Sequence, residues 1–165
     1  MTAEVAFPRV ASVRFERLLP GPVERVWEVL TRPDLLPAWF GEGAIEPREG
    51  GAVSLMAGHI RGVVTQWKPP TRLAYTWNVL SPGEAVSAYP ESYLTLELSQ
   101  RSDQVLLTLT HLPVLDRFEK QNAMGWATFL DLVDAALRGQ PTGDRGVYMR
   151  RNAERFGVDL ENLAR

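Results

Sequence analysis

The chain has 165 residues, of which 45% are hydrophobic and 23% are charged, and a formal net charge of −2. This length is typical of a single domain with a core of its own. The absence of cysteine excludes disulfides, thiolate nucleophiles and cysteine-based zinc sites, and the small net charge argues against a nucleic-acid-binding surface.

The first ten residues, MTAEVAFPRV, do not resemble a targeting segment. They lack both the basic region and the apolar stretch of roughly 7 to 15 residues that a secretory signal contains. No apolar run reaches the length of about 20 residues that crosses a membrane. We therefore expect a soluble cytoplasmic protein, with neither nucleic acid nor membrane among its partners.

A strand and two short helices are predicted near the N-terminus. Alternating apolar and polar residues predict a strand over residues 13–18, and Pro22 suits the first turn of a helix. Apolar residues then follow at the spacing of an amphipathic helix, at Val23, Val26, Trp27 and Leu30. Pro33 ends this helix, and residues 34–40 predict a second short helix with Asp34 as its cap.

Strands and turns follow, and then one long helix. The strand-like segments are 44–47, 51–57, 59–68, 72–79, 93–100 and 104–112. Because Gly-, Pro- or charge-rich turns separate them, and most of these turns are short, we expect consecutive antiparallel pairing. An apolar stripe over residues 117–138 predicts a helix that ends at Gly139 and covers one face of the sheet.

This order of elements resembles the helix-grip fold of the SRPBCC (START-like) superfamily. More specifically, the chain resembles the bacterial branch that is similar to the C-terminal domain of the heat-shock-protein-90 ATPase activator. The segments that show the resemblance are LPGPVERVWEVLTRPDLLPAWF (19–40), REGGAVSL (48–55), GVVTQWKPPTRLAYTW (62–77), LTLTHL (107–112) and GWATFLDLVDAAL (125–137). At Gln66 the chain departs from the family, which often has an acidic residue there.

The resemblance implies an α+β fold. In this fold a curved antiparallel sheet of about six or seven strands wraps around a long C-terminal helix, with two short helices after the first strand. The resemblance says little about activity, because the superfamily includes lipid and hormone binders, polyketide cyclases, self-resistance proteins and co-chaperone modules.

Two regions are expected: a helix-grip ligand-binding domain over residues 1–140 and a C-terminal extension over residues 141–165. The extension lies outside the shared pattern and shows one helical stripe, formed by Tyr148, Met149, Asn152 and Phe156. A short helix is marginal alone in water. We therefore expect the extension to pack on a second subunit or on its own domain, with a homodimer contact favoured because two-fold association is common.

A sheet curled around a single helix encloses a cavity unless large side chains fill the space. The residues expected to face it are Trp39, Phe40, Tyr75, Trp77, Leu109, His111, Trp126 and Phe129. Aromatic residues at these spacings are typical both of a close-packed core and of a pocket wall. Gly125 costs about 1 kcal/mol relative to Ala inside a helix, which indicates either close packing against a strand or room for a ligand.

His111 stands where the strand pattern calls for an apolar residue. In the stretch LLTLTHLPV it shares a face with Leu107 and Leu109. Three roles fit: a structural hydrogen bond, recognition of a polar group on a ligand, or proton transfer. If Tyr75 is buried, its hydroxyl needs a hydrogen-bond partner, which His111 could supply. His59 falls in a turn and is expected to be solvated, and with two histidines in the chain no metal site is predicted.

These observations favour a non-enzymatic protein that binds a hydrophobic small molecule, without a cofactor, with His111 and Tyr75 as polar anchors. One alternative is an enzyme of the cyclase or dehydratase type, with His111 as the general base. Another is a protein-interaction module that modulates a chaperone.

Overall fold

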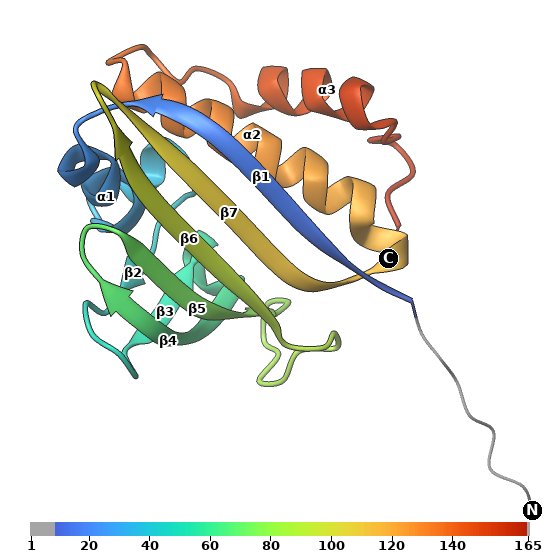
Figure 1. Ribbon diagram of the computed structural model, residues 1–165. Helices are drawn as coiled ribbons and strands as arrows, with labels where there is room; N and C mark the ends of the chain where they lie inside the picture. Colours follow the sequence, from blue (N-terminus) through green and yellow to red (C-terminus); the bar gives the residue numbers. More distant parts are fainter. Residues whose placement is uncertain (1–8, 165) are drawn as a thin grey trace, which may run out of the picture.

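The computed structural model describes residues 9–164, in which seven strands form one antiparallel sheet in the order β1-β7-β6-β5-β4-β3-β2 (Figure 1). The strands are β1 (Val10–Pro20), β2 (Ala44–Ile45), β3 (Ala52–Leu55), β4 (Ile60–Lys68), β5 (Arg72–Val79), β6 (Ser92–Arg101) and β7 (Gln104–Leu115). The helices are α1 (Val23–Thr31), α2 (Glu119–Leu137) and α3 (Arg145–Phe156), and the short 3-10 turns are η1 (Leu36–Ala38), η2 (Met56–Gly58) and η3 (Asp116–Phe118). The ends of the predicted regions, residues 1–8 and 165, lie outside the described residues.

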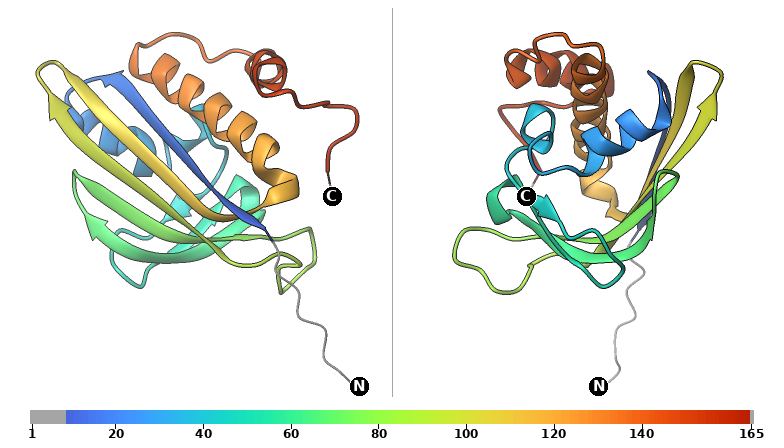
Figure 2. Two further views of the ribbon diagram at one scale, coloured as in Figure 1. Left: turned by 45° about the vertical axis from the view of Figure 1, so that its right-hand side comes forward. Right: turned by 90° about the vertical axis from the view of Figure 1, so that its left-hand side faces the viewer.

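The sheet curves around α2, which lies along its concave side, and α1 with η1 occupies the space beside α2 (Figure 2). This arrangement confirms the predicted α+β helix-grip fold. Each of the six predicted later strands is present. β7 extends three residues beyond its predicted end, through Pro113 to Leu115.

Pro113 is accommodated by an irregularity in the pairing of β7 with β1. Ala11 pairs with Val114, whereas Val13 pairs with His111, so that two residues of β7 lie opposite one residue of β1. Such a bulge leaves a position unpaired, which suits proline because it has no N–H to donate. The strand therefore continues past the position where the sequence pattern suggested a turn.

The core lies between the concave face of the sheet and α2. Leu107, Leu109 and His111 of β7 are all buried on this face, as their alternation predicted. From α2, Trp126, Leu130 and Val133 pack onto the same core. Burial of such side chains stabilises the fold by roughly 1.5 to 3 kcal/mol each.

α3 packs against α2 of its own domain (Figure 2). Phe156 meets Phe15 of β1 edge to face at 6.3 Å between ring centroids. Asn152 is buried, and its amide donates to Thr128 and Asp131 of α2. This contact is one of the two arrangements expected for the extension; a homodimer stays a prediction, which light scattering of the full-length protein tests.

An ionic cluster joins β1, α2 and α3 beside this contact. Arg17 binds Asp131 at 2.5 Å and Asp134 at 3.1 Å, and Arg151 of α3 binds Asp131 at 3.1 Å. Burial alone would raise the pKa of Asp131, but the hydrogen bonds from Asn152 and Arg17 outweigh it and hold that pKa below its ordinary value. The cluster therefore fixes α3 on α2 with the carboxylate in its charged form.

Residues 157–164, here called the C-terminal strap, run from α3 back to the beginning of α2 (Figure 2). The strap ends in a pair of hydrogen bonds. The Ala164 amide donates to Oε1 of Gln121 at 2.5 Å, and Nε2 of Gln121 donates to the Ala164 carbonyl at 3.4 Å. The end of the described chain is thus held at the N-terminal end of α2.

Candidate ligand-binding cavity

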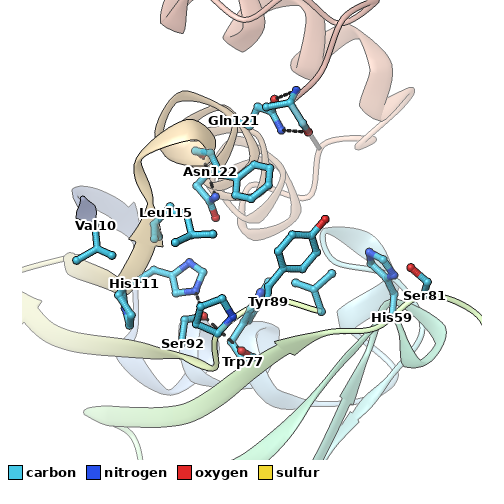
Figure 3. Close-up of a pocket in the computed structure, with 16 residues that line it drawn as sticks. Val10, His59, Trp77, Ser81, Tyr89, Ser92, His111, Leu115, Gln121 and Asn122 are labelled. Atoms are coloured by element: carbon cyan, nitrogen blue, oxygen red, sulfur yellow. Dashed lines mark hydrogen bonds between the residues drawn. The ribbon is translucent and has the colours of Figure 1, made fainter. Parts of the chain in front are cut away.

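A cavity of about 520 Å³ lies where the concave face of the sheet meets the beginning of α2 (Figure 3). Its lining comes from β1, the turn before β4, β5 and the loop after it, β6, β7, η3, the start of α2 and the C-terminal strap. The lining residues are Val10, His59, Trp77, Val79, Ser81, Tyr89, Pro90, Ser92, His111, Pro113, Val114, Leu115, Phe118, Gln121, Asn122 and Ala164. None of these side chains belongs to Asp, Glu, Lys or Arg.

Neighbouring strands supply the floor of the cavity and α2 supplies the facing wall. Trp77, Ser92 and His111 project from β5, β6 and β7, because alternate residues of each strand point to the concave face. Tyr89, in the loop after β5, meets Phe118 edge to face at 5.4 Å. This aromatic contact joins the loop to the beginning of α2 at the cavity.

His111 lies in a chain of hydrogen bonds that uses both of its ring nitrogens. The indole N–H of Trp126 donates to Nδ1 of His111 at 3.0 Å. Because an indole N–H can only donate, the proton of the neutral imidazole is on Nε2, which donates to the Ser92 hydroxyl at 2.7 Å. The Ser92 hydroxyl donates in turn to the carbonyl of Trp77 at 3.3 Å.

This chain keeps His111 neutral. The imidazole is 2% exposed, and burial lowers its pKa from 6.5 to about 4. A general base needs a free lone pair within reach of the substrate. In His111 the lone pair of Nδ1 is occupied by Trp126 and Nε2 holds the proton, so the arrangement supports a structural role and leaves neither nitrogen free for a ligand.

Tyr75 does not bond to His111, so the predicted pairing of the two side chains is wrong. Ser92 and Trp126 take that place. Tyr75 is buried, and burial raises its pKa above the ordinary range. Tyr75 does not line the cavity.

Of the eight residues predicted to face the cavity, Trp77 and His111 line it. The other six pack in the core: Trp39, Phe40, Tyr75, Leu109, Trp126 and Phe129. Phe40 is central among them, stacked on Phe129 at 4.7 Å and edge to face with Trp126 at 6.2 Å. Contact between any of the eight residues and a ligand stays a prediction.

Gly125 is not explained by close packing. A Cβ atom built at this position would meet no atom of the described residues within 4 Å beyond its own helix and neighbours. The residue does not line the cavity either. Nothing in the structure explains why glycine occupies this turn of α2.

Sequence reasoning missed several lining residues, above all Ser92, Tyr89, Asn122 and Ala164. Ser92 had a signal, because it shares the inward face of β6 with Leu94. The other three lie in a loop, at a helix start and in the strap, where no periodic pattern marks the inward side.

Within residues 9–164, no group of three or more His, Cys, Asp or Glu side chains could hold a metal ion. No helix of the same residues is long and apolar enough to cross a membrane.

Comparison with known proteins agrees with the helix-grip fold. Residues 20–138 match the family model of the Activator of Hsp90 ATPase homolog 1-like proteins. CalU16 from Micromonospora echinospora is 28% identical, with a TM-score of 0.71 over 90% of this chain and 87% of that one. The protein encoded by BPP1335 of Bordetella parapertussis is 26% identical, with a TM-score of 0.69 over 100% of both chains.

PFC0360w, an HSP90 activator from Plasmodium falciparum, has a TM-score of 0.63 over 79% of this chain and 97% of that one. At 22% identity this likeness shows the fold alone. No curated protein matches the chain. Because the family model covers residues 20–138, the chain belongs to the Activator of Hsp90 ATPase homolog 1-like family.

Proposed function

We propose that this protein binds an apolar small molecule in the cavity at the beginning of α2, without transforming it. The observation that supports the proposal is the cavity itself. Its volume of about 520 Å³ falls within the range of roughly 300 to 1,000 Å³ that is usual for small-molecule sites. Aromatic, aliphatic and proline side chains form most of its wall, which suits an apolar occupant.

The hydrogen bonds of the cavity floor support binding without catalysis. His111 and Ser92 are bonded to each other, and the remaining nitrogen of His111 is bonded to Trp126. The cyclase or dehydratase alternative would need His111 as a base, and that role requires breaking one of these buried bonds first. The aromatic surfaces of Trp77, Tyr89 and Phe118 remain available for contact with a ligand.

The other expectations about partners and place stay predictions. The family name refers to Hsp90 activation, and the chaperone-modulating alternative stays a prediction. A cytoplasmic location and the absence of nucleic-acid and membrane partners also remain predictions from the sequence.

Native mass spectrometry of gently purified protein tests the proposal. We expect the wild-type protein to retain a small molecule, and the variant Val79→Trp, which places an indole in the cavity, to lose it. Val63→Trp is the matched control, because Val63 is 47% exposed and does not line the cavity. A wild-type protein without a bound molecule, or equal retention by the Val79→Trp variant, would contradict the proposal.

A further inference from the structure

We propose that the cavity selects uncharged ligands that direct a hydrogen-bond donor, such as a hydroxyl group, at Asn122, and that it rejects carboxylates. This inference rests on the proposed function and deepens it. It follows from the hydrogen-bonding inventory of the cavity wall.

The side chains of the cavity wall offer no strong charge, because the sixteen lining residues include no Asp, Glu, Lys or Arg. The nearest ring nitrogens on the floor belong to His111, which is neutral because Trp126 donates to one and the other donates to Ser92. A carboxylate entering this space would lose its hydration and meet no lysine or arginine side chain, which is strongly unfavourable.

Asn122 offers a hydrogen-bond acceptor at the cavity wall. Its Nδ2 donates to the carbonyl of Phe118 at 3.0 Å, which assigns the orientation of the amide. The other amide atom, Oδ1, receives no hydrogen bond from any residue in the range 9–164. Figure 3 shows Asn122 across the cavity from His111. Because Oδ1 can only accept, its complement on a ligand is a hydroxyl or an N–H group.

His59, which also lines the cavity, can supply a second hydrogen-bond acceptor. Nδ1 of His59 lies 2.7 Å from the carbonyl of Leu80, and because a carbonyl only accepts, that nitrogen bears the proton. In the tautomer that matches this bond, Nε2 bears no proton and can accept a hydrogen bond from a ligand. The Tyr89 hydroxyl and the Trp77 indole can donate, but neutral donors alone do not replace the water shell of an anion.

Three pyrene derivatives that differ in one substituent test this selectivity: 1-hydroxypyrene, 1-methoxypyrene and 1-pyrenecarboxylate. Their shared ring system fits a cavity of about 520 Å³, and their emission reports transfer into an apolar site. Titration at neutral pH should rank the hydroxyl compound about 2- to 10-fold above the methoxy compound, the effect of one neutral hydrogen bond. The carboxylate should bind at least about tenfold more weakly than the hydroxyl compound.

Variants of Asn122 then test whether its amide oxygen accepts the hydrogen bond from the ligand. Asn122→Leu should abolish the preference for hydroxyl over methoxy, measured as the ratio of the two affinities in the same variant. Asn162→Leu, at an exposed position of the strap that does not line the cavity, should keep the preference. Asn122→Ala also removes the acceptor oxygen and should likewise abolish the preference, which provides a second measurement if the leucine variant does not fold.

The outcomes separate the two proposals. If the carboxylate binds wild-type protein as tightly as the hydroxyl compound, or if the preference survives in Asn122→Leu, this inference is overturned while binding in the cavity stands. If none of the three compounds binds, the proposed function fails and the inference fails with it.

Discussion

The two halves of the interior share one sheet face and one helix, yet one half is filled and the other is hollow. In the filled half, η1 and the residues after it bring Trp39 and Phe40 between the sheet and α2, where Phe40 stacks on Phe129. At the other end the inward positions hold smaller groups, among them Ser92 and Val79, and no residue of α1 or η1 lines the cavity there. Side-chain volume and the position of η1, rather than the pattern of inward residues, decide where the cavity forms.

The largest difference in stability between the two halves should appear when a tryptophan in each half is replaced by alanine. Trp126 is 3% exposed within the core, so Trp126→Ala should lower the free energy of unfolding by roughly 3 to 5 kcal/mol. Trp77 is half-buried and borders the cavity, so Trp77→Ala should cost markedly less. Denaturant titration measures both, and equal costs would show that Trp77 is packed like the core.

The free energy of unfolding should depend on pH through His111, which lies between the core and the cavity. The pKa of His111 is lowered by burial from 6.5 to about 4, so between these values the unfolded chain binds a proton that the folded protein does not. Stability is then fully present above pH 6.5 and is lost as the pH falls to about 4, by about 3 kcal/mol.

Unfolding titrations at several pH values measure this loss, with His111→Leu as the comparison. His59 is retained in both proteins, so the difference between the two pH profiles reports His111 alone. An identical decline in both proteins would mean that His111 does not hold the depressed pKa that its burial implies.

At neutral pH the substitution His111→Leu should cost about 1 to 3 kcal/mol, because it leaves the buried indole N–H of Trp126 without an acceptor. Adding Trp126→Phe removes that orphaned donor. In a double-mutant cycle the two changes should therefore be less costly together than the sum of their separate effects. Strict additivity would indicate that the hydrogen bond contributes nothing.

The smallest effect concerns the C-terminal strap. Ending the chain after Gly157 removes Ala164 from the cavity wall and both bonds to Gln121, but it uncovers little of the core. Release of bound 1-hydroxypyrene in stopped-flow measurements should become roughly 3- to 10-fold faster, the effect of about one hydrogen bond. Gln121→Leu, which keeps the strap, should show part of the increase; an unchanged rate in the shortened chain would exclude the strap as a functional wall.

Periodicity was sufficient to predict the fold and the inward face of β7, including His111. It could not predict the partners of His111, because Ser92 comes from the neighbouring strand and Trp126 from a helix, and their approach depends on how α2 lies on the sheet. It also could not predict that six of the eight inward residues fill the core. The loop around Tyr89 and the strap around Ala164 have no repeating pattern, so their contribution to the cavity depends on tertiary structure alone.

The most direct test of binding in the cavity uses the indole N–H signals of the five tryptophans, resolved in one ¹H–¹⁵N spectrum during titration with 1-hydroxypyrene. Trp77 lines the cavity and Trp126 bonds to His111 on its floor. Trp27 and Trp67 pack against each other at 5.1 Å and do not line it. We predict that the signals of Trp77 and Trp126 move while those of Trp27 and Trp67 stay; movement of the latter pair alone, or of no signal, would contradict a ligand site at the beginning of α2.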